Sequence, residues 1–159
     1  PQEWDVRRIT RRGMFAAGCL ASLFAGEAIA RTADDWPRTH HLIIQVTADD
    51  PTAMRLALDN AVNVDRHYSE IGEDVDIEII AYGAGLHMLR DDTSPVKARI
   101  KSVGDSLRSI RFVACGNTLQ TMERKEGHPV TLLPRAEVVQ TGVAYIMDLQ
   151  EKGWSYVRP

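Results

Sequence analysis

The fold of this chain is decided by the stretch Ser109-Ile110-Arg111-Phe112-Val113-Ala114-Cys115-Gly116-Asn117-Thr118-Leu119. An apolar run ends on Cys115, a glycine and two residues typical of helix N-termini follow, and a helix-like segment then begins. This order predicts that Cys115 lies where a strand ends and a helix begins, with Asn117 or Thr118 as the helix cap.

Strand and helix patterns alternate on both sides of this junction. Short apolar runs predict strands at residues 42–46, 75–82, 130–133 and 154–157, in addition to the run into Cys115. Helical spacing, capping residues such as Asp50 and Thr141, and closing glycines predict a helix in each segment between them. The alternation predicts one α/β domain with a mainly parallel five-stranded sheet and helices on both faces.

Length and composition limit the class of protein. The chain has 159 residues, which suits one domain with a proper core. Apolar residues make up 44% and charged residues 26%, values typical of a globular domain. The net charge is −3 and no basic stripe with interleaved aromatic residues is present, so nucleic acid is not an expected partner.

The first 30 residues have the layout of an export signal. A start rich in arginine leads into an almost uncharged run, and Ala28-Ile29-Ala30 supplies a small-x-small cleavage pattern. The stretch Thr10-Arg11-Arg12-Gly13-Met14-Phe15 resembles the twin-arginine signal, which implies export of a folded protein to the periplasm. We expect a signal peptide at residues 1–30, a linker or arm at 31–41 and the domain at 42–159, with an uncleaved anchor as the alternative.

Removal of the signal has two consequences. Cys19 is lost with it, so Cys115 becomes the remaining thiol and no intramolecular disulfide can form. No stable membrane span is expected once the signal is gone.

Ligands of parallel sheets bind at the carboxyl ends of the strands. That edge is predicted to gather Asp49, the turn at residues 83–87, residues 115–118 and Pro134-Arg135. The turn Gly83-Ala84-Gly85-Leu86-His87 lacks the third glycine of a dinucleotide fingerprint, because Met88 stands there, so its glycines indicate a tight turn or a close backbone approach. The predicted pocket residues are Gly83, Gly85, His87, Gly116, Asn117 and Thr118.

Cys115 is the candidate catalytic residue. Unpaired N–H groups and the dipole at a helix N-terminus stabilise a thiolate, and they can also hold a bound anion or the outer sulfur of a persulfide. A buried, unreactive cysteine that closes a strand is the alternative. No catalytic triad is readable, since His87 is the one candidate base and it can equally be a simply hydrogen-bonded side chain.

The remaining histidines and acidic pairs carry weaker signals. His40 and His41 lie next to each other in an extended segment and point to opposite sides, which predicts one exposed and one packed ring rather than a chelating pair. Asp49 and Asp50 precede a helix, so capping is favoured over metal binding. A metal site of Cys115 with His87 or His40 is kept as a third reading, and no metal or other cofactor is expected.

Several motifs resemble the DsrE/DsrF-like family of sulfur-relay-type proteins with a YchN-like fold. They are Phe112-Val113-Ala114-Cys115-Gly116-Asn117-Thr118-Leu119, Leu132-Leu133-Pro134, Val138-Val139, Thr141-Gly142-Val143 and the end from Leu149 to Pro159. The resemblance covers roughly residues 40–159. It implies a three-layer, flavodoxin-like α/β sandwich, a trimer or hexamer, and sulfur carried as a persulfide on the cysteine at the position of Cys115.

Two functions follow as hypotheses. In the first, an exported sulfur-handling protein, a carrier or transferase at most, holds sulfane sulfur on Cys115 and passes it to a partner protein. In the second, a non-enzymatic homo-oligomer binds a small anion or a protein partner at the same strand-end pocket.

Overall fold

The structure, a computed structural model, describes residues 38–159. The predicted signal peptide and most of the predicted arm, residues 31–37, lie outside the described residues. Within the described part, no helix is both long enough and apolar enough to cross a membrane.

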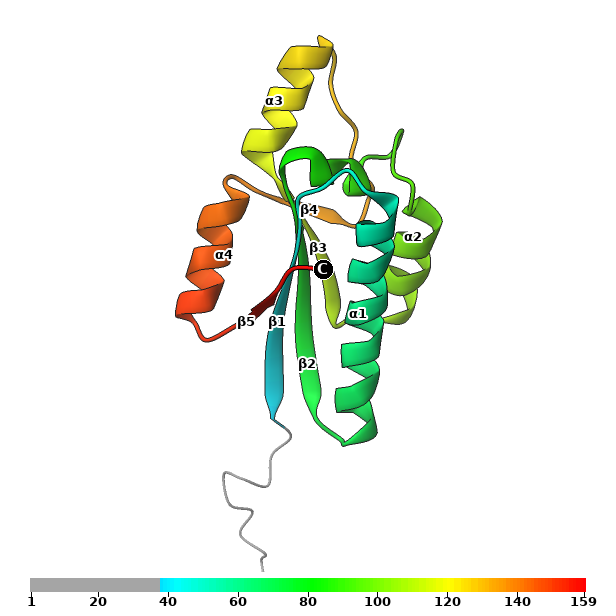
Figure 1. The fold of residues 1–159 in the computed structure, drawn as a ribbon, viewed down its shortest axis with the longest axis vertical. Coiled ribbons are helices and arrows are strands. Elements are labelled where there is room, and N and C mark those ends of the chain that lie inside the picture. The colour runs from blue at the N-terminus through cyan, green and yellow to red at the C-terminus, as the bar shows by residue number, and fades with distance from the viewer. Residues whose placement is uncertain (1–37) are drawn as a thin grey trace, which may run out of the picture. The chain divides into compact units, whose positions relative to one another are not determined.

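The described chain forms one five-stranded sheet in which every pair of neighbouring strands is parallel (Figure 1). The strands are β1 (Thr39–Val46), β2 (Asp74–Ala81), β3 (Ile110–Cys115), β4 (Ala136–Val139) and β5 (Ser155–Val157), in the order β4-β3-β2-β1-β5. The helices are α1 (Pro51–Glu70), the 3-10 helix η2 (Gly83–Leu89), α2 (Lys97–Ser106), α3 (Gly116–Glu126) and α4 (Gly142–Glu151). The predicted flavodoxin-like α/β class is confirmed.

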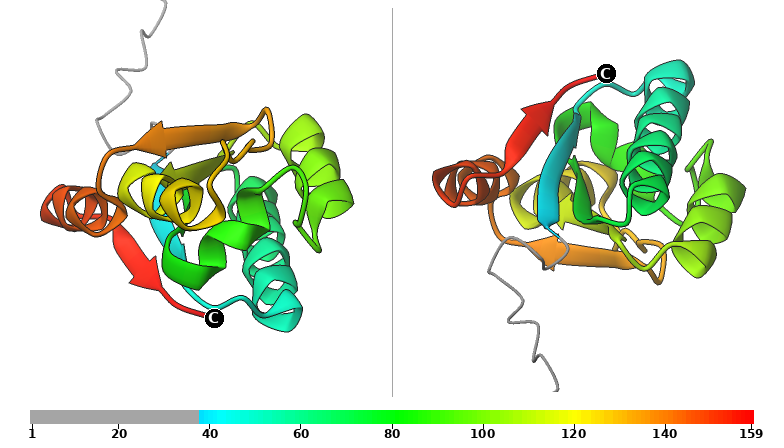
Figure 2. Two further views of the ribbon diagram at one scale, coloured as in Figure 1. Left: turned by 90° about the horizontal axis from the view of Figure 1, so that it is seen from above. Right: turned by 90° about the horizontal axis from the view of Figure 1, so that it is seen from below.

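The direction of each crossover decides which face a helix covers. From β1 to β4 the chain steps one way across the sheet, and from β4 to β5 it steps back past the others. Because such connections are right-handed, α4 lies on the face opposite to α1 and α2 (Figure 2). Helix α3 projects beyond the carboxyl ends of the strands (Figure 1).

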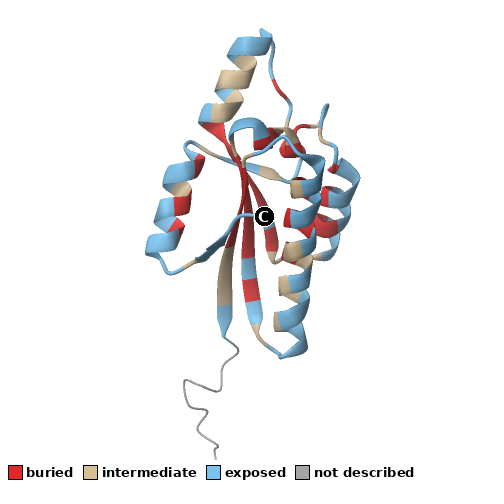
Figure 3. Ribbon diagram, in the orientation of Figure 1, coloured by how far each residue is buried: buried red, intermediate tan, exposed pale blue. Residues whose placement is uncertain are grey.

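Alternating side chains of the central strands fill two cores. Ile44, Ile77 and Phe112 belong to the larger core beneath α1 and α2. Their neighbours Ile43 and Ile80 belong to the smaller core beneath α4. Both faces of the central strands are therefore buried (Figure 3), which explains why the strands read as nearly continuous apolar runs.

Local sequence signals account for several helix ends. The Asp50 carboxylate accepts the Thr52 N–H over 2.8 Å at the start of α1, and Pro51 occupies the first helical position, as predicted. Helix α3 ends at Gly127, whose φ of 74° is the left-handed conformation that glycine adopts without strain.

The predicted fourth strand is wrong in position. Residues 130–133 form no strand, and their one sheet-like contact is an isolated antiparallel bridge from Leu132 to Arg90. The strand β4 begins only at Ala136. The apolar run at 130–133 reflects burial of a connecting segment, since Val130 and Leu133 are buried, whereas β4 is a half-exposed outer strand. Pro134 and Arg135 consequently precede β4 and lie at its amino end, not at the predicted ligand edge.

The boundary predicted for the N-terminal arm is also corrected. Strand β1 begins at Thr39, so His40 and His41 belong to the sheet. They point to opposite faces as expected: His40 stacks on Tyr68 at 3.9 Å between ring centroids and His41 on Trp154 at 4.8 Å. The expectation of one exposed ring and one packed ring is wrong, because each aromatic neighbour leaves its histidine half-buried, at 33% and 37% exposure.

Candidate functional site

The candidate site lies where the chain leaves two neighbouring strands in opposite directions. After β3 the chain continues into α3, which packs on the larger core through Leu119 and Met122, whereas after β4 it crosses to α4 on the other face. Cys115, the last residue of β3, pairs with Val139, the last residue of β4. Such a reversal opens a crevice at the carboxyl ends of the strands, which is where parallel α/β sheets bind ligands.

The Cys115 thiol lies against the starts of two helices. Cys115 itself is the N-cap residue of α3, and its Sγ accepts the N–H of Gly142, the first residue of α4, over 3.3 Å. The residue is 6% exposed. Neither Asn117 nor Thr118 caps α3 as predicted, because both lie within its first turn. The thiol therefore faces backbone N–H groups at the starts of both helices.

The surroundings of the thiol change its acidity in two directions. Burial raises the pKa of Cys115, because a charged sulfur loses solvation. Hydrogen bonds from the Gly142 N–H and from the Thr118 hydroxyl and N–H lower it, and the nearby Asn117 N–H, whose main acceptor is the Gln140 carbonyl, adds the smallest contribution. The net result is a pKa below the usual value for cysteine, which favours the thiolate.

Asn117 connects the segments that carry these N–H groups. Its backbone N–H donates to the Gln140 carbonyl over 3.0 Å, and its side-chain Nδ2 donates to the Thr141 hydroxyl over 3.0 Å. The Gln140 amide in turn donates to the Asn117 Oδ1 over 2.7 Å. These three bonds fix the loop between β4 and α4 on the start of α3, and so hold Gly142 against the thiol.

Two glycines leave the space that this arrangement needs. A Cβ at Gly142 would lie 3.1 Å from the Cys115 Cβ and 3.6 Å from the Tyr82 side chain. A Cβ at Gly116 would lie 3.3 Å from the Val139 carbonyl oxygen. The predicted pocket residue Gly116 thus serves close packing of α3 on β4.

Four predicted residues line a hollow of about 600 Å³ between η2 and α3. They are Gly83, His87, Asn117 and Thr118. Cys115 does not line this hollow, and among the described residues no hydrogen bond joins it to His87. The His87 Nδ1 instead lies 3.1 Å from the Thr93 hydroxyl.

Thr118 connects the hollow with the thiol. Its Oγ1 accepts the Gly83 N–H over 3.1 Å on one side, and the same hydroxyl lowers the pKa of Cys115 on the other. Gly85, by contrast, is buried, and a Cβ there would lie 2.3 Å from the Val46 carbonyl oxygen. The second glycine of the turn permits close backbone approach to β1 and does not reach the hollow.

The structure gives no support to the metal reading. Across residues 38–159, no group of three His, Cys, Asp or Glu side chains is placed to hold a metal ion. His40 stands at the amino end of β1, whereas Cys115 stands at the carboxyl end of β3, so these two are not brought together. Asp50 is used as a helix cap.

Sequence reasoning missed Gly142 and the bonds that hold it. The pair Thr141-Gly142 marks the start of a helix, and a glycine at the first helical position indicates close packing. That signal does not name Cys115 as the neighbour, which lies 27 residues earlier in the chain.

The chain resembles two solved structures of uncharacterised proteins. A protein of unknown function from Methanobacterium thermoautotrophicum, MTH1491, is 31% identical, with a TM-score of 0.62, over 76% of this chain and 99% of that one. A conserved protein of unknown function from Bacteroides thetaiotaomicron, BT1422, is 18% identical, with a TM-score of 0.50, over 75% of this chain and 94% of that one, and shares the fold. No family model and no curated protein matches. The identity and coverage of the first match show that this chain belongs to the same family as MTH1491.

Proposed function

We propose that Cys115 carries sulfane sulfur as a persulfide and passes it to a partner protein, in the manner of the DsrE/DsrF-like proteins that the sequence resembles. The observation that carries the proposal is the 3.3 Å contact from the Gly142 N–H to the Cys115 Sγ, at the junction of two helix N-termini. Such a setting stabilises the thiolate that attacks sulfur, and it suits the anionic outer sulfur of a persulfide.

The chemistry is an exchange of one S–S bond for another. The Cys115 thiolate attacks the outer sulfur of a persulfide donor, R–S–SH; the donor's S–S bond breaks and its electron pair leaves with the thiolate R–S⁻. The product is Cys115–S–SH. An acceptor thiolate then attacks that outer sulfur, and the electron pair of the broken bond returns to the Cys115 thiolate. Neither step consumes an oxidant or a reductant.

The small opening above the thiol limits which donors can react. A residue that is 6% exposed admits a thin chain of sulfur atoms more readily than a bulky disulfide. Inorganic polysulfide and low-molecular-weight persulfides are therefore the donor class that fits, and a folded partner would have to present its sulfur at the end of a projecting segment.

Intact mass measurement tests the proposal. The protein, carrying Cys19→Ser so that one thiol is left, is incubated with polysulfide, desalted and weighed. We expect a gain equal to the mass of one sulfur atom, which a reductant removes and which Cys115→Ser abolishes. A gain that survives Cys115→Ser, or no gain in the parent protein, refutes sulfur carriage on this residue.

The proposal extends to location and assembly. A twin-arginine signal would place the protein in the periplasm, and intact mass from a periplasmic extract would show both the cleavage point and any bound sulfur.

Val143 and Met147 are 48% and 56% exposed on α4, and Val138 is 55% exposed on β4. These apolar side chains support burial between copies in a trimer or hexamer. We expect Met147→Glu to shift the mass measured by light scattering toward that of a single chain.

The hollow between η2 and α3 favours a second candidate function. Its lining combines the first-turn residues Asn117 and Thr118 with Lys125, a set suited to a small anion. The one carboxylate among its described lining residues, that of Glu126, is bonded by Arg90. A binding module of this kind predicts thermal stabilisation by the anion that persists in Cys115→Ser and disappears in Lys125→Glu. Loss of the stabilisation in Cys115→Ser would instead assign the anion to the sulfur chemistry.

A further inference from the structure

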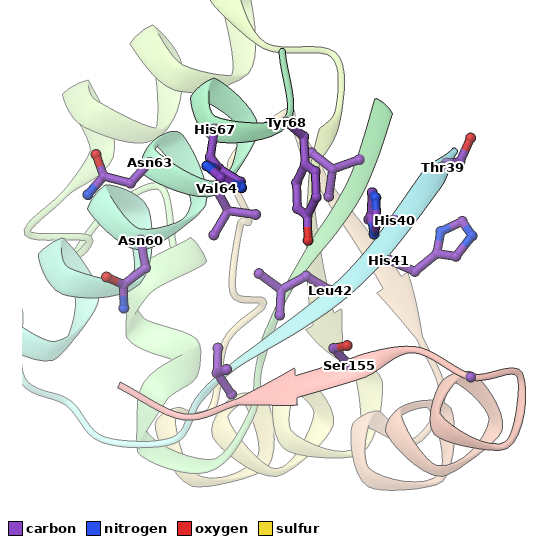
Figure 4. Close-up of a pocket in the computed structure, with 13 residues that line it drawn as sticks. Thr39, His40, His41, Leu42, Asn60, Asn63, Val64, His67, Tyr68 and Ser155 are labelled. Carbon is purple, nitrogen blue, oxygen red and sulfur yellow. The ribbon is translucent and has the colours of Figure 1, made fainter. Parts of the chain in front are cut away.

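A second hollow lies on the opposite half of the molecule from Cys115. It has a volume of about 590 Å³ and is formed where α1 passes over the first half of β1, next to β5 (Figure 4). Asn60, Val64 and Tyr68 recur every four residues along α1 and so face the hollow from one side. The volume falls in the range of about 300–1,000 Å³ that is typical of small-molecule sites.

The lining of this hollow combines apolar side chains, amides and hydroxyls with three histidines, His40, His41 and His67. Of its described lining residues, none is an aspartate, glutamate, lysine or arginine. Leu42, Val64 and Val157 make an apolar floor and wall, and the amides and hydroxyls of Asn60, Tyr68 and Ser155 lie at its margin. His40 already bonds Glu73, and His41 lies 3.6 Å from the Asp76 carboxylate. A bound phosphate or carboxylate would therefore lie near two carboxylates of the protein, whereas a flat apolar ring with polar edge atoms would meet no such repulsion.

One aromatic wall is held in place without a ligand. The Tyr68 ring stacks on His40 at 3.9 Å with 17° between the planes, and His40 in turn bonds Glu73 at 2.7 Å. Figure 4 shows the Tyr68 hydroxyl directed toward Leu42 and Ser155. A side chain that is already ordered costs little conformational entropy on binding, so this wall is prepared for a ring laid against the floor.

We propose that this hollow binds an uncharged, flat heteroaromatic molecule of the size of a purine nucleoside. Its ring lies on Leu42 and Val157 beside Tyr68, and its edge atoms exchange hydrogen bonds with the Asn60 carboxamide and the Tyr68 and Ser155 hydroxyls. A carboxamide offers a donor and an acceptor side by side, which matches the donor and acceptor pair on a purine edge. The site is independent of Cys115, which lies at the carboxyl end of β3.

Titration of the full chain with adenosine, followed by amide NMR, tests the proposal. We expect shifts confined to residues 39–42, 60–68 and 155–157, with no change next to Cys115. Adenosine monophosphate serves as the charged counterpart and is expected to bind at least tenfold more weakly, about 1.4 kcal/mol. No shifts with adenosine, or equal binding of the monophosphate, overturns the proposal.

Two variants probe the hollow from different sides. Val64→Trp fills it and Asn60→Leu removes a polar edge without adding a ring; each is expected to weaken adenosine at least tenfold. Arg55→Trp, which adds the same indole on an exposed part of α1, is expected to leave binding unchanged. If Val64→Trp fails to fold by circular dichroism, Asn60→Leu decides, and unchanged binding in that variant refutes the assignment.

Discussion

Asn117 donates its side-chain amide to the Thr141 hydroxyl over 3.0 Å and thereby ties the start of α3 to the residue that precedes α4. The next residue, Gly142, supplies the first N–H of α4, which bonds the Cys115 sulfur. Asn117 is therefore a positioning residue for the thiol, although its side chain does not bond the sulfur.

Replacement of Asn117 by alanine is expected to raise the pKa of Cys115. The loop before α4 loses two side-chain bonds, so the Gly142 N–H stabilises the thiolate less. We expect the midpoint of a pH profile of alkylation by iodoacetamide, measured in a Cys19→Ser background, to move up by about 0.5–1 unit. Gln120→Ala, at an exposed position of the same helix, is the matched control, and an equal movement there contradicts the role of Asn117.

Loss of the Thr118 hydroxyl is expected to act in the same direction. Thr118→Val keeps the shape of the side chain but removes a bond to the thiolate and leaves the Gly83 N–H without its acceptor. The alkylation midpoint should rise, and Thr118→Ser should restore it because serine retains the hydroxyl. A profile that is the same for valine and threonine would show that this hydroxyl does not reach the sulfur.

A side chain at Gly142 is expected to destabilise the fold. The new Cβ of Gly142→Ala would lie 3.1 Å from the Cys115 Cβ, so either α4 or β3 must shift. Overpacking of this kind costs about 1–3 kcal/mol in the free energy of unfolding, measurable by urea denaturation. The change Gln150→Ala, at an exposed position of the same helix, should cost less than about 0.5 kcal/mol.

The Arg90 side chain is buried and donates hydrogen bonds to the carboxylates of Asp92 and Glu126. This arrangement is expected to make the free energy of unfolding fall in acid. Hydrogen bonds from Arg90 lower the pKa of Asp92 from 3.8 to about 2 and hold the pKa of Glu126 below its usual value. Carboxylates with a lowered folded-state pKa stabilise the fold above their unfolded pKa, and the contribution is lost as the pH falls through the folded value.

Thermal unfolding between pH 5 and pH 2 checks this prediction. The melting temperature should fall over the interval from about pH 4 to about pH 2, and the fall should be shallower in Asp92→Asn, which cannot ionise. An identical slope in that variant would locate the acid sensitivity elsewhere.

Local signals predicted most of the fold. Asp50-Pro51 placed the start of α1, and Gly127 placed the end of α3, because each acts on the backbone of its own segment: the Asp50 carboxylate accepts an N–H of α1, and Gly127 adopts the left-handed conformation. The wrong strand prediction at residues 130–133 has a physical cause. A run of apolar residues indicates burial, and a buried connecting segment has the same run of apolar residues as a buried strand. The outer strand β4 is half-exposed, so its sequence lacks a continuous apolar run that would predict a strand.

The candidate site was predictable only in part. The position of Cys115 at a strand end follows from one continuous stretch of sequence. Its contact with Gly142 does not, because it depends on the register of β3 with β4 and on the return of the chain to the far face. His87 was predicted at the same edge as Cys115, but its ring lies against the Thr93 hydroxyl and it lines a hollow that Cys115 does not reach.

Helix α4 lies in the connection between the two outermost strands of the sheet and begins at the Cys115 sulfur. The segment from Gly142 to Glu151 carries the chain from β4, at one margin, to β5, at the other, and its first N–H rests on Cys115. An atom added to that sulfur would lie beside the beginning of this segment. The connection between the two outermost strands therefore starts at the atom that we propose to carry sulfur.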